Sequence, residues 1–310
     1  MQKFERAAVL GAGVIGASWT SLFLAAGLEV DVFDVSKTAE TDVRAYIANA
    51  WPTLEELGMT ENGSPDNVNF HSSAGDAVAN AQFVQENVPE RIAIKHATYQ
   101  EIEPRLLPDA IVSSSASGLM VSEMQEGWKD PSRFILGHPF NPPHLIPLVE
   151  LLANDKTADG VLEEAEAFYK QVGKVTIRVN REVPAHVSNR LQAALWREAI
   201  HLYVEGVASL EDVDKAVWAG PGLRWAAMGP HMLFNLAAGE GGMAEFCNRY
   251  GDSFHRWWDD LGEVELTSDI AEKLVDGARE AMHGKTLDET AGDRDKLIVA
   301  MLKSTKDLRA

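Results

Sequence analysis

A doubly wound α/β domain followed by an all-helical domain is the fold class that this sequence predicts. Short apolar runs alternate with segments of helical periodicity as far as about residue 180. A glycine-rich loop follows the first apolar run, and the pattern becomes wholly helical from Pro184 onward. Alternation of strands and helices is typical of a mostly parallel sheet with helices on both faces.

The elements of the first domain follow one another in a regular order. RAAVLGAG (6–13) predicts a strand, residues 14–27 a helix, LEVDVFDV (28–35) the next strand, and residues 38–58 a helix. A further helix is expected at 92–103, and further strands are expected at 82–88, 109–116, 134–140, 148–153 and 174–180.

The second domain begins with a long amphipathic helix over residues 183–206. Everything after it has a helical pattern, with breaks at Gly220–Gly222, Gly239–Gly242 and Gly262. We place the boundary near Glu182–Pro184, which gives a domain at 1–183 and a helical domain at 184–310. The charged tail KSTKDLRA (303–310) is expected to be exposed.

Composition limits the possible functions. The net charge of −19 argues against a nucleic-acid partner, since phosphate binding needs a basic surface. No apolar run is long enough to span a bilayer, and the first residues leave no room for a signal peptide. Cys247 is the single cysteine, which favours a reducing, cytoplasmic setting, and we interpret it as a small packing residue. No metal site is expected.

The first loop carries the motif G-x-G-x-x-G at Gly11, Gly13 and Gly16. Gly11 permits a tight turn, Gly13 lets the backbone approach a pyrophosphate, and Gly16 lets the helix pack on the sheet. The motif alone is weak, but here it follows a predicted strand and opens a predicted helix. The alternative is a glycine-rich turn without a ligand. The context favours a Rossmann-type dinucleotide site.

Asp34 stands at the end of the second predicted strand, 23 residues after Gly11. An acidic residue at about this distance binds a ribose 2′-hydroxyl and repels a 2′-phosphate. The pyrophosphate is expected at the helix N-terminus, near the amides of Val14 and Ile15. The predicted cofactor is therefore NAD rather than NADP, although Lys37 nearby is a reservation.

GHPFNPPHLIPLVEL (137–151) raises the question of catalysis. His138 ends one predicted strand and Glu150 lies in the next, after a proline-rich loop that could bring the two together. A carboxylate on one imidazole nitrogen fixes the tautomer and raises the basicity of the other nitrogen. Such a histidine can accept a proton from a hydroxyl as hydride leaves the same carbon. The alternatives are a structural histidine and a salt bridge at a strand end.

Two further polar residues are candidates for substrate binding. Ser117 ends the serine cluster of VSSSASGL, and its hydroxyl could hold a substrate oxygen. Asn189 is expected in the first turns of the long helix, where its amide could polarise a carbonyl. Both residue types are also common helix caps, so neither position is decisive.

Together these motifs resemble the L-3-hydroxyacyl-CoA dehydrogenase superfamily. The resemblance rests on the glycine motif, Asp34, ENVPE (86–90), SSSAS (113–117), GHPFNPP (137–143) and VSNRL (187–191), and it covers about the first 240 residues. It implies His138 as general base, Glu150 as its partner, and Ser117 and Asn189 as ligands of the substrate oxygen. It also implies a helical second domain that forms a homodimer.

The same resemblance implies three further contacts. Glu90 and Lys95 match the family's cofactor-contacting glutamate and lysine, and Asn141 matches the asparagine of its His-x-x-Asn-Pro motif. Acyl-CoA enzymes of the family commonly place lysines after the second strand to bind CoA phosphates. Residues 38–90 carry nine acidic residues and a single Lys or Arg, Arg44, so we expect no CoA ester as substrate.

The expected substrate is a small free 3-hydroxy acid, since this sequence looks closer to that branch of the superfamily. Arg224 is the best candidate for its carboxylate, and Arg190 is second. The many aromatic residues of the second domain, Trp225 among them, could form a cage for a trimethylammonium group and favour L-carnitine. The alternatives are L-gulonate, a 3-hydroxybutyryl-CoA, and a crystallin-like protein that binds NAD without catalysis.

Overall fold

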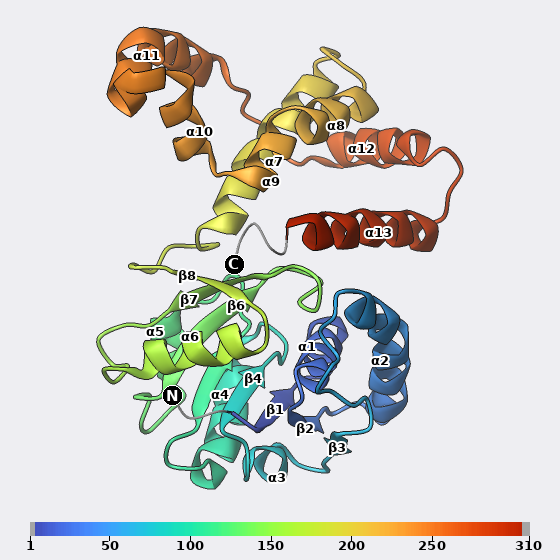
Figure 1. Ribbon diagram of the computed structural model, residues 1–310, viewed down its shortest axis with the longest axis vertical. Coiled ribbons are helices and arrows are strands. Elements are labelled where there is room, and N and C mark those ends of the chain that lie inside the picture. Colours follow the sequence, from blue (N-terminus) through green and yellow to red (C-terminus); the bar gives the residue numbers. More distant parts are fainter. Residues whose placement is uncertain (1–3, 306–310) are drawn as a thin grey trace. The chain divides into compact units, whose positions relative to one another are not determined.

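The computed structural model describes residues 4–305 and divides them into two compact units (Figure 1). The first unit holds the chain up to Val187 and again from Asp293, and the second holds Ser188–Gly292. The last part of the expected exposed tail, residues 306–310, lies outside the described residues. The boundary near Glu182–Pro184 stays a prediction.

An eight-stranded sheet in the order β3-β2-β1-β4-β5-β6-β7-β8 forms the centre of the first unit. All neighbouring strands are parallel except β6 and β7. The strands are β1 (Arg6–Leu10), β2 (Glu29–Phe33), β3 (Val68–Phe70), β4 (Phe83–Glu86), β5 (Ile111–Ser114), β6 (Phe134–Pro139), β7 (Leu148–Leu152) and β8 (Val175–Arg178).

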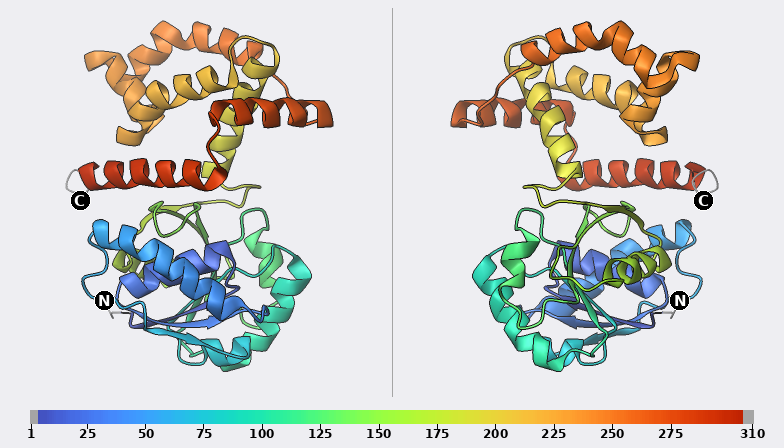
Figure 2. Two further views of the ribbon diagram at one scale, coloured as in Figure 1. Left: turned by 90° about the vertical axis from the view of Figure 1, so that its right-hand side faces the viewer. Right: turned by 90° about the vertical axis from the view of Figure 1, so that its left-hand side faces the viewer.

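Helices cover both faces of this sheet, as the two side views show (Figure 2). They are α1 (Val14–Ala25), α2 (Ala39–Glu56), α3 (Ala74–Val78), α4 (Ile92–Ile102), α5 (Val121–Gln125) and α6 (Val161–Gln171). The predicted doubly wound fold class is confirmed. The sequence patterns missed β3, which has only three residues, and the five-residue helices α3 and α5.

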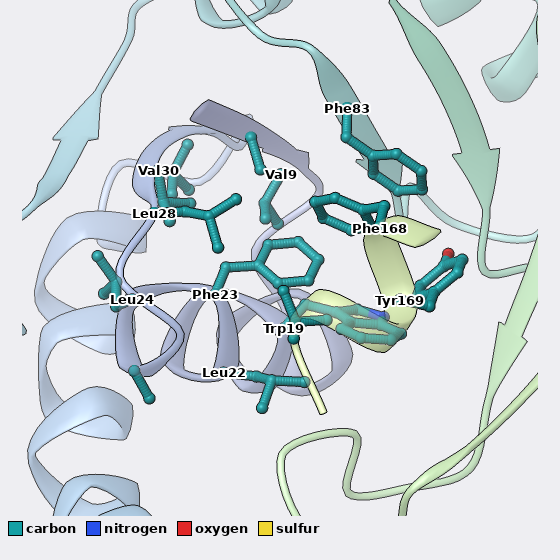
Figure 3. Close-up of a cluster of buried hydrophobic side chains, with 14 of the residues drawn as sticks. Val9, Trp19, Leu22, Phe23, Leu24, Leu28, Val30, Phe83, Phe168 and Tyr169 are labelled. Atoms are coloured by element: carbon teal, nitrogen blue, oxygen red, sulfur yellow. The ribbon is translucent and has the colours of Figure 1, made fainter. Parts of the chain in front are cut away.

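Each face of the sheet has its own hydrophobic core. On one face Trp19 of α1 and Phe168 of α6 belong to a large buried cluster, in which Phe83 stacks on Phe168 at 3.7 Å between ring centroids (Figure 3). On the other face Tyr99 of α4 stacks on Trp128 at 4.8 Å. Burial of such large rings is the main force that holds the helices on the sheet.

The strand order reverses between β1 and β4, which are adjacent in the sheet. Ligands of open α/β sheets bind beyond the carboxyl ends of the strands at such a point. The glycine loop after β1 and the polar residues after β4 both follow carboxyl ends there. The fold therefore puts the candidate site at the carboxyl ends of β1 and β4.

The second unit is entirely helical. Its helices are α7 (Ser188–Val204), α8 (Leu210–Ala219), α9 (Pro221–Ala227), α10 (Pro230–Ala237), α11 (Gly242–Asp260) and α12 (Ser268–Ala281), and α13 (Leu287–Thr305) begins there and continues into the first unit. The long helix begins at Ser188, five residues later than expected. Cys247 is exposed, so its interpretation as a packing residue is wrong for the single chain. Within residues 4–305, each helix is too short or too polar to cross a lipid bilayer.

Candidate active site

The glycine loop joins β1 to α1, and each of its three motif glycines meets a different constraint. Gly11 has φ +80°, and a Cβ there would lie 2.6 Å from the carbonyl oxygen of Asn87. A Cβ on Gly16 would overlap the carbonyl oxygen of Gly11. A Cβ on Gly13 would meet nothing within 4 Å. Gly11 and Gly16 are thus required by the fold, whereas Gly13 leaves open space beside the loop.

The N-terminus of α1 is suited to hold an anion. Gly13 is its N-cap and provides no side-chain cap, and the first turn contains no acidic residue. Val14, the first helical residue, is 62% exposed. The amides of Val14 and Ile15 belong to the first turn of the helix, whose N–H groups have no intrahelical acceptor and point toward a ligand at this end.

Asp34 lies directly beyond β2, beside the glycine loop. One carboxylate oxygen accepts the N–H of Ala12 at 2.6 Å, and the other accepts the N–H of Ser36 at 2.7 Å. These bonds fix the half-buried carboxylate, and each oxygen retains a lone pair for a ribose hydroxyl. The open space at Gly13, the uncapped helix and this carboxylate fit a dinucleotide such as NAD.

His138 and Glu150 are brought together by the β6–β7 hairpin. They are paired in its antiparallel register, and the imidazole Nδ1 lies 2.8 Å from the Glu150 Oε2. His138 is 5% exposed and Glu150 is fully buried. Because a carboxylate only accepts, Nδ1 carries a hydrogen, and in the neutral ring Nε2 then has a lone pair. Within residues 4–305 no hydrogen bond to Nε2 is present, so this nitrogen is available to a proton donor.

Ser117 and Glu90 are also brought together. The Glu90 carboxylate accepts the backbone N–H of Ser117 at 2.8 Å, the Ser117 hydroxyl at 2.9 Å, the N–H of Leu119 at 3.1 Å and the N–H of Gly118. Burial raises the pKa of Glu90, but the bonds from Gly118, Ser117 and Leu119 outweigh burial and hold its pKa below the usual value. The Ser117 hydroxyl must rotate away from Glu90 to donate to a substrate oxygen.

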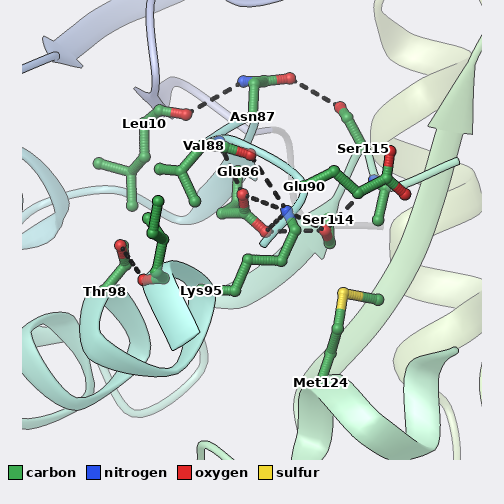
Figure 4. A network of polar contacts seen from close by, with 12 residues as sticks. Leu10, Glu86, Asn87, Val88, Glu90, Lys95, Thr98, Ser114, Ser115 and Met124 are labelled. Atoms are coloured by element: carbon green, nitrogen blue, oxygen red, sulfur yellow. Dashed lines mark hydrogen bonds and ion pairs between the residues drawn. The ribbon is translucent and has the colours of Figure 1, made fainter. Parts of the chain in front are cut away.

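Lys95 is placed differently from the expectation. Its ammonium is 1% exposed and lies 2.7 and 2.9 Å from the two carboxylate oxygens of Glu86, which is itself fully buried (Figure 4). Glu86 also accepts the hydroxyls of Ser114 at 2.7 Å and Tyr99 at 2.8 Å. The ammonium is thus held inside the domain by its counterion, and the cofactor contact of Lys95 stays a prediction.

The loop between β6 and β7 carries Asn141 and His144. Asn141 is exposed, whereas His144 is buried against α1. The Ser18 hydroxyl accepts the backbone N–H of His144 at 2.9 Å and lies 2.8 Å from its Nδ1. The hydroxyl, which already accepts that N–H, can donate to Nδ1 when His144 is the neutral Nε2–H tautomer. Burial is the main cause that lowers the pKa of His144 to about 4. This histidine anchors the loop.

The remaining candidates lie in the second unit. Asn189 is the second residue of α7, and Arg224 and Trp225 lie in α9, where Trp225 is 39% exposed. Other aromatic rings gather between α10 and α11, where Phe234 stacks on Phe246 at 4.7 Å. Trp225 is not part of this cluster among the described residues.

Some residues near the site were not predicted. Asn87, at the end of β4, accepts the Ser115 hydroxyl at 2.7 Å and donates to backbone oxygens, which ties β4 to β5 (Figure 4). His186 lies beside His138, with ring centroids 5.3 Å apart. The position of Asn87 after a strand was a usable signal, but nothing local in the sequence marks His186.

Comparison with known proteins agrees with these features. Residues 6–183 match the family described as 3-hydroxyacyl-CoA dehydrogenase, NAD binding domain. Residues 186–275 match the description 3-hydroxyacyl-CoA dehydrogenase, C-terminal domain. Together the two matches cover most of the chain, and the first spans the glycine loop, Asp34 and the His138–Glu150 pair.

Individual relatives are similar over nearly their whole length. L-carnitine dehydrogenase from Streptomyces coelicolor is 41% identical over 304 residues, which covers 98% of this chain and 96% of that protein. L-carnitine dehydrogenase from Bacillus cereus is 40% identical over 299 residues, covering 96% and 92%. A crystal structure of 5-formyl-3-hydroxy-2-methylpyridine 4-carboxylic acid 5-dehydrogenase, an NAD+ dependent dismutase, is 27% identical with a TM-score of 0.84 and covers 98% and 99%.

Both the cofactor and the reaction class follow from these matches and from the fit of the glycine loop. NAD is the cofactor, and the protein is a dehydrogenase. The chain belongs to the 3-hydroxyacyl-CoA dehydrogenase family.

Proposed function

We propose that this protein oxidises the 3-hydroxyl of a small free L-3-hydroxy acid, with L-carnitine as substrate and 3-dehydrocarnitine as product. The observation that carries the proposal is the buried His138–Glu150 pair, which leaves Nε2 of His138 available in an NAD-binding domain. The identity of about 40% to several proteins named L-carnitine dehydrogenase supports this choice of substrate.

The proposed chemistry assigns each group one task. NAD, when bound, would supply the acceptor for the hydride that leaves C3 of the substrate. Nε2 of His138 takes the hydroxyl proton, and Glu150 stabilises the imidazolium that forms. Ser117 and Asn189 donate hydrogen bonds to the oxygen as it becomes a carbonyl. Gly11, Gly13, Gly16 and Asp34 would hold the cofactor, and the amides of Val14 and Ile15 would bind its pyrophosphate.

The proposed substrate contacts lie in both units. We propose that Arg224 pairs with the carboxylate and that Trp225 faces the trimethylammonium group, with Asn141 as a further substrate contact. Charge argues against a CoA ester. Arg44, the single Lys or Arg between residues 38 and 90, lies 2.9 Å from Glu40, so that segment offers little positive charge to CoA phosphates.

A panel of substrates tests the proposal. NADH formation is followed at 340 nm with NAD and, separately, L-carnitine, L-gulonate, L-3-hydroxybutyrate and 3-hydroxybutyryl-CoA. Turnover with L-carnitine and little with the others is expected. Turnover with L-gulonate or hydroxybutyrate instead would reject the aromatic cage, and turnover only with the CoA ester would reject the charge argument. Binding of NAD without any turnover would indicate a crystallin-like role.

We also propose a homodimer formed through the second unit. Trp196, Trp218, Trp257 and Trp258 are each more than half exposed in the single chain. Large exposed apolar side chains of this number are typical of an interaction surface. Light scattering after size exclusion should give about twice the mass of 33.9 kDa. The cytoplasmic location stays a prediction.

A further inference from the structure

His186 has no task in the mechanism above, yet it is buried beside the proposed base. It lies between β8 and α7 and is 2% exposed. Its ring centroid is 5.3 Å from that of His138, and its Nε2 is 3.4 Å from the carbonyl oxygen of Ala116. Ala116 directly precedes Ser117, the proposed ligand of the substrate oxygen. The side chain therefore touches two parts of the site.

The contact with Ala116 determines the tautomer of His186. A carbonyl oxygen only accepts, so Nε2 carries the hydrogen and donates it. Nδ1 is then a lone-pair nitrogen, and it is buried without a hydrogen-bond partner among the described residues. Protonation would bury an unpaired positive N–H, and burial is the main cause that lowers the pKa of His186. A neutral ring thus lies next to the group that becomes charged during turnover.

The backbone around His186 is held in an unusual conformation. Ala185 has φ +63° and His186 has φ +52°, both in the left-handed region. This conformation costs about 1–2 kcal/mol for each L-residue and persists only where the surroundings determine it. One such restraint is visible, because the N–H of Val187 donates to Glu150 Oε1 at 3.1 Å. The segment is fixed through a backbone bond to Glu150 and a side-chain bond to Ala116.

We propose that His186 is a positioning residue for the dehydrogenase reaction. Its Nε2–H holds the Ala116 carbonyl, and through it the Ser117 segment, at a fixed distance from His138. The inference rests on the proposed roles of His138 and Ser117. Loss of the donor would let the Ser117 segment move, which lowers kcat while leaving the glycine loop and Asp34 in place.

A pair of amide variants separates the donor from the rest of the side chain. In His186→Gln the amide nitrogen reaches the position of Nε2 and can still donate to Ala116. In His186→Asn the amide ends at the position of Nδ1, and asparagine tolerates the left-handed backbone. We expect kcat to fall at least tenfold in His186→Asn and to stay within about threefold of wild type in His186→Gln, with KM for NAD unchanged in both.

Hydrogen exchange of residues 113–120 provides a readout that does not depend on activity. It should accelerate at least tenfold in His186→Asn and little in His186→Gln, because the amides of this segment bond to Glu90 only while the segment is held. His96→Asn is the matched control, since His96 Nε2 also lies against a backbone carbonyl, that of Glu123 at 2.8 Å. It should change neither exchange at 113–120 nor kcat.

Two results would overturn the inference. One is wild-type exchange and kcat in His186→Asn, and the other is an equal loss in the Gln and Asn variants. If His186→Asn does not fold, His186→Phe, which keeps a ring without the donor, replaces it in the same comparison. An inactive wild type with the expected exchange pattern would reject the proposed function but keep the positioning role.

Discussion

His138 and Glu150 are direct cross-strand partners in the only antiparallel pair of the sheet that residues 4–305 form. Their side chains meet at 2.8 Å in a buried position. The carboxylate fixes the tautomer of the imidazole without closing access to Nε2. The two residues therefore have separable roles, which substitutions can distinguish.

Removal of the imidazole should abolish catalysis. In His138→Ala no side chain is left to accept the hydroxyl proton, and a positioned general base contributes about 10²–10⁴-fold to rate. Turnover with L-carnitine should fall by at least that factor, while the Kd for NAD, measured by fluorescence titration, stays within about threefold. Turnover near the wild-type level in this variant would reject His138 as the base.

Loss of the Glu150 carboxylate should lower turnover less than loss of the His138 imidazole, but the effect should still be large. Glu150→Gln keeps the shape and a hydrogen-bonding oxygen but removes the negative charge that stabilises the imidazolium. We expect kcat to fall about 10–10³-fold with KM for NAD unchanged. The thermal midpoint should be followed in parallel, because a loss of activity that merely tracks unfolding would argue for a structural salt bridge.

The glycine loop allows a matched pair of substitutions. Gly13→Ala adds a methyl group to open space, so the fold should keep its thermal midpoint while Kd for NAD rises at least tenfold. Gly16→Ala adds the same methyl group against the Gly11 carbonyl and should lower the free energy of unfolding by more than about 2 kcal/mol. Calorimetry of both apo variants checks this. Unchanged NAD affinity in Gly13→Ala would reject the glycine loop as the binding site of the NAD pyrophosphate.

The buried Lys95–Glu86 pair predicts a stability effect rather than a binding effect. Lys95→Met leaves the Glu86 carboxylate buried without its counterion, which typically costs about 3–5 kcal/mol. Urea denaturation should detect this loss, and adding Glu86→Gln should restore part of it. A Lys95→Met protein of wild-type stability with weak NAD binding would instead support the cofactor contact that the sequence suggested.

His144 predicts a pH-dependent term in stability. Its folded-state pKa of about 4 lies below the ordinary value of 6.5, so the native state binds fewer protons in that range. The contribution is fully present above pH 6.5 and is lost as pH falls toward 4, on the order of 3 kcal/mol in total. His144→Asn keeps an acceptor for Ser18 but does not titrate. The stability difference between wild type and variant should shrink over this range, and a pH-independent difference would contradict the assignment.

Features that depend on neighbouring residues could be predicted from the sequence. The glycine loop works through local backbone geometry, and Asp34 follows from the length of one strand–helix–strand unit. The His138–Glu150 contact depends on one hairpin and its loop. In each case the residue spacing largely determines the distance, so the pattern was sufficient.

Features that depend on distant packing could not be predicted. A family motif located Lys95 along the chain, but its burial depends on Glu86 and Tyr99 lying on neighbouring elements of the folded domain. His186 meets Ala116 across 70 positions of sequence, and His144 meets Ser18 across 126. Such contacts arise from the strand order of the sheet, and single-residue patterns do not contain that order.

The hairpin that carries the proposed base and its partner is one continuous peptide of fewer than twenty residues. Its register alone determines how the two groups meet. A slip of one residue would put the His138 and Glu150 side chains on opposite faces of the sheet. The second unit, which holds Arg224 and Trp225, takes no part in that register. On the roles proposed above, changes in Arg224 or Trp225 are expected to alter which hydroxy acid is accepted without disturbing proton transfer, so that one proton-transfer hairpin can serve different substrates.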